Sequence, residues 1–349
     1  MDDRIRGVNL SGWFIPEPWV TPSLFAATGA STDAELQENL GTVEYNERIR
    51  QHYETFITEE DFRRMSSIGL NAVRIPVPWH VFGLQNDAAT YISAIDYIDR
   101  AMEWGSKYNV SVLLDLATVP GGQGDSNEPQ TTSRYIADWH SSTNGRHVAL
   151  EVLERLAARY AVADALYGIE LLDSPVMSVR KNMFTMTDGI PGHYLRNFYR
   201  DAYDLLRKHM TNDKAVVFSA SGYPGLWKHF MRSSQYKNVM MDVHLYHYHD
   251  ENAQDITSPR GLSAAIARNK AQIREAVGTG FPVIIGEWSA AAVMSSEGRS
   301  AYERVFVANQ LASFSQAEGW FFQTWKTEKR IAAWDARLAL GTLERAMLD

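Results

Sequence analysis

A glutamate at position 287 is the clearest candidate for chemistry in the sequence. It directly follows the apolar run Pro282 to Gly286 and precedes a tryptophan. A carboxylate at the end of a buried strand is partly desolvated, so it is costly unless a cation or a hydrogen-bond donor pairs with it. Candidate partners elsewhere in the chain are Arg74, His244 and Tyr246. The alternative is a structural acid that pins its strand to a neighbouring loop.

Two of these partners also allow purely structural interpretations. Arg74 interrupts an apolar strand pattern, and it could form a buried ion pair or hold a ligand. His244 could equally be a hydrogen-bonded histidine of the interior. The cluster of His244, His247, His249 and Asp250 lacks the helical HExxH spacing of zinc sites, so we expect no metal and no other cofactor.

The elements that would position these residues follow a repeated strand-then-helix order. Eight short apolar runs are predicted strands: Arg6 to Leu10, Ala72 to Ile75, Ser111 to Leu116, Tyr167 to Leu172, Ala215 to Ser219, Val239 to Leu245, Pro282 to Gly286 and Trp320 to Thr324. Amphipathic helices are predicted over 58–67, 91–108, 146–160, 194–209, 263–277 and 297–317. Eight such units predict an α/β fold of the (β/α)₈ TIM barrel type, as one domain over residues 1–349.

The main alternative fold is an open doubly wound sheet. That fold would carry a Gly-x-Gly-x-x-Gly phosphate turn after its first strand, and the sequence has none. Chemistry in barrels gathers at the carboxyl ends of the strands. The polar, glycine-bearing insert from Trp19 to Phe56 and the loop from Pro120 to Trp139 are expected to wall that end.

Composition excludes several classes of function. The chain has 349 residues, a net charge of −8 and no cysteine, which rules out disulfides and thiol catalysis. Its basic residues are scattered, so nucleic acid and anionic membranes are not expected partners. No run reaches the roughly 18 apolar residues of a membrane span, and the start, Met1 to Arg4, lacks the apolar core of a signal peptide. We expect a monomer.

Several ordered blocks resemble one family. They are Arg6-Gly-Val-Asn-Leu-Ser-Gly-Trp13 with Glu17-Pro18-Trp19, Asn71-Ala-Val-Arg-Ile-Pro76, Asp115, Gly168-Ile-Glu-Leu-Leu172, Asp242-x-His244-x-Tyr246, Pro282 to Ala290 and Trp325-Lys-Thr-Glu328. Together they resemble fungal exo-β-1,3-glucanases of glycoside hydrolase family five, across nearly the whole chain. The resemblance implies a retaining β-glucan hydrolase, with Glu287 as nucleophile and a second glutamate after the fourth barrel strand as acid/base.

The second glutamate is missing. Where the family has Asn-Glu-Pro, this chain has Asp173-Ser174-Pro175, so Ser174 occupies the acid/base position and Asp173 that of a sugar-binding asparagine. The family's histidine after Asp-Leu is Ala117 here, and the expected aromatic before Thr324 is Gln323. A serine hydroxyl is far too weak an acid to protonate a departing sugar oxygen, and losing general acid/base help costs about 10² to 10⁴ in rate.

The sequence therefore predicts a pseudoenzyme that binds β-1,3-glucan or an oligosaccharide in its former active site. Predicted glycan contacts are Glu17, Arg74, Asp115, Asp173, His244, Tyr246, Trp288 and Trp325. With one carboxylate gone, Glu287 is expected to be stably ionised. One alternative is an active retaining glucosidase whose acid/base is Asp173 or a carboxylate in the loop 125–128; another is a protein scaffold without glycan binding. The resemblance implies an extracellular or fungal cell-wall location, and a cytoplasmic one stays open.

Overall fold

The eight predicted strands form one closed parallel barrel in the computed structural model, which describes residues 4–85, 90–120, 139–182, 185–248, 254–294, 299–341 and 343. The barrel strands are β1 (Ile5–Asn9), β2 (Ala72–Val77), β5 (Ser111–Leu116), β6 (Leu166–Glu170), β9 (Ala215–Ser219), β10 (Val239–His247), β11 (Val283–Ala292) and β12 (Gly319–Phe322). β1 pairs with both β2 and β12, which closes the ring. This confirms the predicted (β/α)₈ single-domain fold, with small shifts in strand ends.

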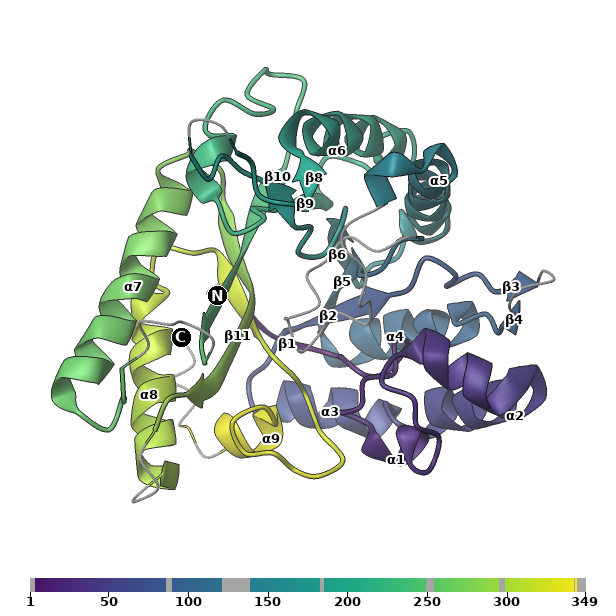
Figure 1. Cartoon of the computed structure of the whole chain (residues 1–349), viewed down its shortest axis with the longest axis horizontal. Helices are drawn as coiled ribbons and strands as arrows, with labels where there is room; N and C mark the ends of the chain where they lie inside the picture. The colour runs from purple at the N-terminus through teal and green to yellow at the C-terminus, as the bar shows by residue number, and fades with distance from the viewer. Residues whose placement is uncertain are drawn as a thin grey trace.

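Helices surround the barrel (Figure 1). They are α1 (Pro22–Phe25), α2 (Asp33–Thr55), α3 (Glu59–Ser67), α4 (Ile95–Tyr108), α5 (Thr143–Tyr160), α6 (Gly192–Leu206), α7 (Pro259–Val277), α8 (Arg299–Ser313) and α9 (Ala336–Ala339). The connection from β9 to β10 carries only a 3₁₀ helix, Pro224–Trp227. Two short strand pairs, β3 (Leu84–Gln85) with β4 (Thr90–Tyr91) and β7 (Met177–Ser178) with β8 (Ile190–Pro191), lie outside the barrel.

Side chains inside the barrel change character from one end to the other. Successive residues of a strand point to opposite faces, so residues two apart share the interior. Toward the amino ends of the strands, the interior cluster is apolar: Ile5, Ala72, Leu113, Ala215, Val217, Met240, Ile284 and Phe321. Two residues further along β2 and β5, Arg74 and Asp115 follow, and both are fully buried. An apolar plug therefore supports a polar layer at the carboxyl ends, where barrel enzymes place their sites.

The insert between β1 and β2 is largely helical. It holds α1 and the long α2, whose helical path is interrupted at Gly41, where φ is 71° and glycine is tolerated without a Cβ clash. His52 near the end of α2 contacts the carbonyl oxygen of Gly12 in the loop after β1 at 2.7 Å. The insert thus packs against a loop at the barrel mouth, as predicted, while the loop 121–138 lies outside the described residues.

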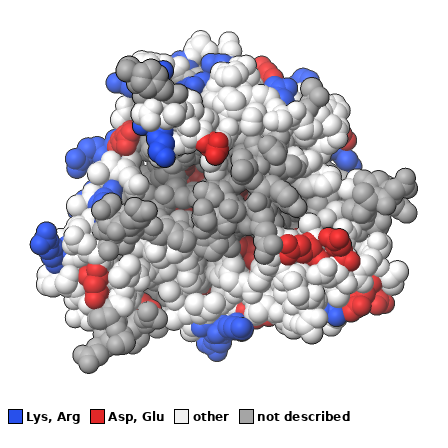
Figure 2. Space-filling view, in the orientation of Figure 1, with Lys and Arg blue, Asp and Glu red and all other residues white. Residues whose placement is uncertain are grey.

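Charged side chains are spread over the surface of the molecule (Figure 2). Figure 2 shows Lys and Arg side chains dispersed mainly around the edge of the visible face, with acidic side chains among them. Among the helices that the structure describes, none combines the length and apolar character that a membrane crossing requires.

Asp33 at the start of α2 makes folding sensitive to pH. Burial, opposed by the hydrogen bond from the Tyr45 hydroxyl at 2.7 Å, raises the pKa of Asp33 from 3.8 to about 7. Because the folded-state pKa is raised, this carboxyl favours folding fully below about pH 4, and its contribution declines as pH rises and is lost above about pH 7. At about 1.4 kcal/mol per pKa unit, the shift corresponds to at most about 4 kcal/mol.

The variant Asp33→Asn should therefore gain stability relative to the unchanged protein as pH rises from about 4 to 8. Asparagine keeps an oxygen that accepts from Tyr45 but carries no charge. Urea denaturation of both proteins at several pH values measures the effect. A stability difference that stays constant over this range would contradict the buried, neutral state of Asp33.

Candidate active site

The guanidinium of Arg74 is the centre of the polar layer. It is fully buried, and carboxylates and an amide from neighbouring strands surround it. Its contacts are Nε to Glu170 Oε2 at 2.8 Å, Nη2 to Asp173 Oδ1 at 2.8 Å and to Asp115 Oδ2 at 3.2 Å, and Nη1 to Asn9 Oδ1 at 3.0 Å and to Glu287 Oε1 at 3.2 Å. Only Arg offers donors in a planar fork that can bind this many oxygens at once. The structure thus favours the ion-pairing interpretation of Arg74 and places it against Glu287.

Two of these carboxyl groups are buried with more negative neighbours than one cation can balance. Burial raises the pKa of Asp115 and of Glu170 well above the ordinary range, although the charge of Arg74 opposes the shift. Among the described residues, Glu170 Oε1 and both Asp115 oxygens have no hydrogen-bond partner, because the contact of Asp115 Oδ2 with Arg74 is an ion pair without hydrogen-bond geometry. Both groups therefore favour the protonated state in the folded protein.

Glu287 lies on β11 beside β10 and is almost fully buried. The pairing of these strands slips by one residue between Val243 and His244, so that His244 pairs with Glu287. Bulges of this kind commonly re-aim side chains near active sites. The Tyr246 hydroxyl donates to Glu287 Oε2 at 2.7 Å, and His244 Nδ1 lies 3.2 Å from the same oxygen. The structure thus brings together all the partners predicted for Glu287.

The pKa of Glu287 is raised. Burial is the main cause, the charges of His244 and Arg74 oppose it, and the negative charge of Asp173 adds to it. The expectation of a stably ionised Glu287 assumed that a neighbouring carboxylate had been lost. Asp173 stands where the family has an uncharged asparagine, so it restores a like charge beside Glu287.

Ser174 ends a chain of hydrogen-bonded groups. Its Oγ lies 2.8 Å from His244 Nδ1, and His244 Nε2 lies 2.8 Å from Asp242 Oδ2. Asp242 Oδ1 in turn accepts from the Gly286 amide at 2.6 Å. A Cβ at position 286 would come within 2.3 Å of the Asp242 carboxylate, so this approach requires glycine. The Ser174 hydroxyl is thus tied to a buried Asp–His pair.

The loop after β1 contributes Glu17. Its Oε1 accepts from the Gly12 amide at 3.1 Å and its Oε2 from Trp19 Nε1 at 2.8 Å. Burial, opposed by the Trp19 hydrogen bond and reinforced by the charges of Glu287 and Asp173, raises the pKa of Glu17 to about 8. Electrostatic coupling to Glu287 places Glu17 near the same site, where it is protonated at neutral pH.

A group of partly exposed aromatic rings lies next to Tyr246. The Trp334 ring centroid is 5.7 Å from that of Tyr246, 5.0 Å from that of Tyr248 and 5.3 Å from that of Trp19. We call Trp19, Tyr246, Tyr248 and Trp334 the aromatic rim. Such rings offer flat apolar faces beside polar groups, the combination that sugar sites use.

Two predicted glycan contacts point away from the polar layer. Trp288 is fully buried, and its ring packs edge-on against Phe314, Trp320 and Phe322, outside the barrel. Trp325 is also fully buried, and its Nε1 donates to Asp61 of α3 at 2.8 Å. Neither ring is part of the site that we propose below. Strand alternation explains the orientation of Trp288, because Glu287 faces the barrel interior and the next residue of the strand must face outward.

Six residues of the site were absent from the sequence-based set. Asn9, Glu170 and Asp242 belong to the polar layer, and Trp19, Tyr248 and Trp334 to the aromatic rim. A signal for Asn9 and Asp242 was available, because each is a polar residue in an apolar strand at an even spacing from an interior apolar residue. No pattern marks Trp334, which lies in an irregular segment.

Two trios of side chains have possible metal-ligand atoms within 4.8 Å of one another: Asp173, His244 and Glu287, and Asp115, Glu170 and Asp173. Arg74 contacts at least one carboxylate of each trio. A divalent cation would meet this fixed positive charge, so the donor set fits a metal ion poorly.

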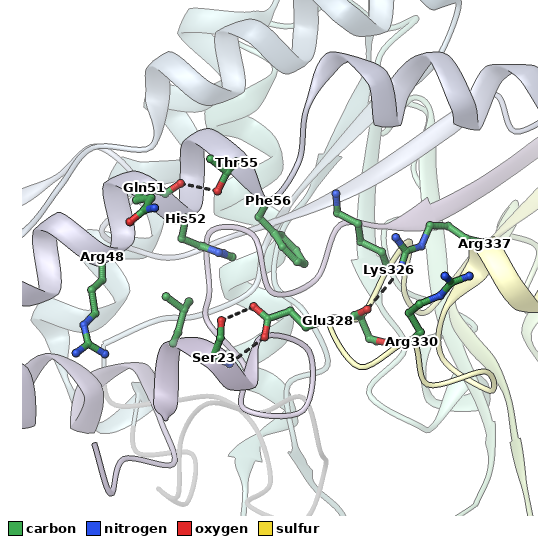
Figure 3. A pocket seen from close by; sticks show the side chains of 12 residues that line it. Ser23, Arg48, Gln51, His52, Thr55, Phe56, Lys326, Glu328, Arg330 and Arg337 are labelled. Carbon is green, nitrogen blue, oxygen red and sulfur yellow. Dashed lines mark hydrogen bonds between the residues drawn. The ribbon is translucent and has the colours of Figure 1, made fainter. Parts of the chain in front are cut away.

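A separate pocket of about 650 Å³ lies between α2 and the segment after β12 (Figure 3). Across it, the Ser23 amide and hydroxyl donate to the Glu328 carboxylate. His52, which lines it, contacts the Gly12 carbonyl, and Gly12 donates to Glu17. The pocket therefore lies behind the loop that presents Glu17 and outside the polar layer.

Comparisons with known proteins agree with this geometry. The family model described as Cellulase (glycosyl hydrolase family 5) matches residues 34–326. The chain is 30% identical to a probable glucan 1,3-beta-glucosidase A of Emericella nidulans, over 99% of this chain and 91% of that protein. It is 31% identical to a glucan 1,3-beta-glucosidase of Blumeria graminis, over 94% and 83%.

Among solved structures, a rutinosidase from Aspergillus niger superimposes with a TM-score of 0.81 at 20% identity, covering 100% of this chain and 99% of that one. An endoglucanase from Thermotoga maritima gives a TM-score of 0.61 at 13% identity, with 99% and 96% coverage. At such identities these two matches show the fold alone. From the family model and the 30% identity over nearly its full length, the chain belongs to glycosyl hydrolase family 5.

Proposed function

We propose that this protein binds a β-1,3-glucan chain end or oligosaccharide at its barrel mouth and cleaves glycosidic bonds far more slowly than a carboxylate-pair enzyme. The observation that carries the proposal is Ser174 at the acid/base position, with its hydroxyl 2.8 Å from His244. Retaining cleavage uses two carboxyl groups about 5 to 5.5 Å apart, one to attack carbon and one to protonate the leaving oxygen. In this proposal the attacking carboxylate, Glu287, is kept and the carboxyl proton donor is absent.

The nearest carboxyl group is poorly placed to replace the donor. Asp173 precedes Ser174, but its Oδ1 accepts a hydrogen bond from Arg74 at 2.8 Å. To protonate a sugar oxygen it would have to give up this contact with a buried guanidinium. The loop 125–128, which holds the other candidate carboxylates, lies outside the described residues.

Sugar binding needs none of the lost chemistry. Ionised or neutral carboxyl groups, the Tyr246 hydroxyl and the rings of the aromatic rim can hold a glucosyl unit through hydrogen bonds and stacking. The named glucan 1,3-beta-glucosidase relatives support β-1,3-glucan as the ligand. A location outside the cell or in a fungal cell wall would bring the protein to that polymer.

The test pairs isothermal titration calorimetry with a hydrolysis assay on laminari-oligosaccharides. We expect saturable binding of the trisaccharide or a longer chain and glucose release slower than that of an active relative by about 10² to 10⁴. Cello-oligosaccharides in the same titration measure linkage preference. Tight binding together with the turnover of an active relative would reject the proposal, and so would the absence of binding.

Trp334→Ala should weaken laminari-oligosaccharide binding by about tenfold, because a lost stacking face costs about 1 kcal/mol or slightly more. The matched control is Tyr302→Ala, since Tyr302 is an exposed aromatic residue on α8. Calorimetry on both variants gives the comparison. Equal affinities for the two variants would show that the aromatic rim does not contact the glycan.

A further inference from the structure

The backbone conformation of Ser174 directs its hydroxyl toward His244. The Ser174 φ of 36° lies in the left-handed region, which residues other than glycine rarely adopt. In that conformation its Oγ contacts His244 Nδ1, while the other ring nitrogen contacts Asp242. A hydroxyl that merely filled space left by a lost side chain would not require this alignment of three groups.

Charges from three strands and a loop face His244. Asp242 lies on its own strand at 2.8 Å, Glu287 on β11 at 3.2 Å, and Asp173 on the loop after β6 at 3.8 Å. Arg74 on β2 contacts the last two carboxylates from the far side. Burial alone would lower the pKa of His244, but the charges of Glu287 and Asp242 outweigh it and raise the pKa well above the ordinary value.

These charges favour the imidazolium form of His244, with a proton on each nitrogen. The Nε2 proton is held by Asp242, whose own pKa is lowered: burial would raise it, and the charge and hydrogen bond of His244 outweigh burial. The Nδ1 proton faces two oxygens, Ser174 Oγ and Glu287 Oε2. One cationic donor thus lies between the attacking carboxylate and the hydroxyl at the acid position.

We propose that Ser174 and His244 together supply the proton for glycosidic bond cleavage, with Ser174 as the group that touches the leaving oxygen. The inference rests on the proposed function, because it requires a glucosyl unit at this site. The bond from the anomeric carbon to the leaving oxygen breaks as Glu287 bonds to that carbon. The Ser174 hydroxyl proton moves to the leaving oxygen, and the His244 Nδ1 proton moves to Ser174 Oγ. The products are a glycosyl ester, a free alcohol and neutral His244.

Glu287 couples the two events. Its negative charge is the largest of the charges that favour the imidazolium, and ester formation removes it. His244 consequently becomes a stronger acid at the moment when a proton is needed. In the second step, a water oxygen bonds to the anomeric carbon and the bond from that carbon to Glu287 breaks, so Glu287 regains its charge. A proton of this water passes through Ser174 to neutral His244. The cycle closes without another reactant.

A leaving-group series tests this relay. Aryl β-glucosides with leaving groups from dinitrophenol to phenol, and laminaribiose, are assayed with the unchanged protein, Ser174→Ala and Ser178→Ala. Ser178 is a control on the same loop, where its hydroxyl donates to the Thr187 carbonyl. We expect Ser174→Ala to lower kcat/KM by about tenfold or more on laminaribiose and phenyl glucoside, with a loss that shrinks steadily as the leaving group needs less protonation.

The dependence on the leaving group separates proton transfer from a structural role. A structural defect would lower kcat/KM by the same factor for every substrate. That result, or no loss of kcat/KM at all, would overturn the relay. Hydrolysis of no substrate by the unchanged protein would overturn it as well. Calorimetry on the same samples keeps the two proposals distinct: binding of laminari-oligosaccharides without leaving-group dependence removes the relay alone, whereas absence of binding removes the proposed function.

Discussion

Replacing Ser174 by glutamate is expected to raise the rate of laminaribiose hydrolysis by about 10² to 10⁴, the usual contribution of a general acid/base. Ser174 Oγ and Glu287 Oε2 both contact His244 Nδ1, at 2.8 and 3.2 Å. These two contacts limit the separation of the two oxygens to at most 6.0 Å, the sum of the two distances. A carboxyl group at position 174 would therefore start near Glu287, and retaining glycosidases hold their two carboxyl groups roughly 5 to 5.5 Å apart. The proposal requires no other change to the barrel or to Glu287, the proposed nucleophile.

The electrostatic surroundings suit such an acid. A carboxyl group at position 174 would lie beside Asp173 and Glu287, and like charges raise the pKa of a carboxyl group. It would consequently carry its proton at the pH where Glu287 attacks. The matched control is Ser174→Gln, which has almost the same shape and no acidic proton. Glucose release from laminaribiose should increase for glutamate and not for glutamine.

A second variant, in which Asp173 is also changed, tests the same idea through the pH profile of kcat/KM. In the double variant Asp173→Asn/Ser174→Glu, one negative charge beside the new acid is gone, so the pKa of that acid falls. The alkaline limb of the pH profile of kcat/KM should shift to lower pH compared with Ser174→Glu alone. If Ser174→Glu binds laminari-oligosaccharides but is no faster than Ser174→Gln, the missing acid does not limit cleavage, and the proposed function is wrong.

The sequence predicted the barrel well because its strands are buried on both faces. The strand Ser111 to Leu116, for example, is short, apolar except for Ser111 and Asp115, and followed by an amphipathic helix, which is the pattern of parallel strands. The predicted end of β11 at Gly286 was too early, since that strand continues to Ala292. Where a strand ends in polar side chains at the barrel mouth, its apolar run stops before the strand does, so an apolar run underestimates the length of the strand.

The site was harder to predict because two of its features depend on geometry. The one-residue shift in the pairing register of β10 and β11 places Glu287 beside His244, and no pattern in the sequence predicts this shift. The raised pKa of Glu287 depends mainly on its burial, and to a lesser extent on the charge of Asp173, which contacts the same guanidinium of Arg74. Spacing along the chain identified the participants, and only the closed barrel fixes their distances.

Stability should depend strongly on Arg74. Replacing it by methionine is expected to lower the free energy of unfolding by about 3 to 5 kcal/mol, because a buried network that loses its cation leaves uncompensated charge behind. The charge of Arg74 lowers the pKa of Asp115, Glu170, Asp242 and Glu287. Methionine fills much of the same volume, so the loss reports electrostatics more than packing. The control is Arg100→Met, whose half-exposed pairing with Glu54 is worth at most about 1 kcal/mol.

The pH dependence of this loss follows from the same contacts. Without Arg74, the folded-state pKa values of Asp115, Glu170, Asp242 and Glu287 are expected to rise, while the unfolded-state values stay the same. A raised folded-state pKa favours folding at low pH and disfavours it as pH rises, so the Arg74→Met deficit should be larger at about pH 8 than at about pH 5. Urea denaturation of both variants at these two pH values measures it. A deficit below about 1 kcal/mol at the higher pH, or one that grows on acidification, would show that the carboxyl groups of the polar layer are held neutral without the guanidinium.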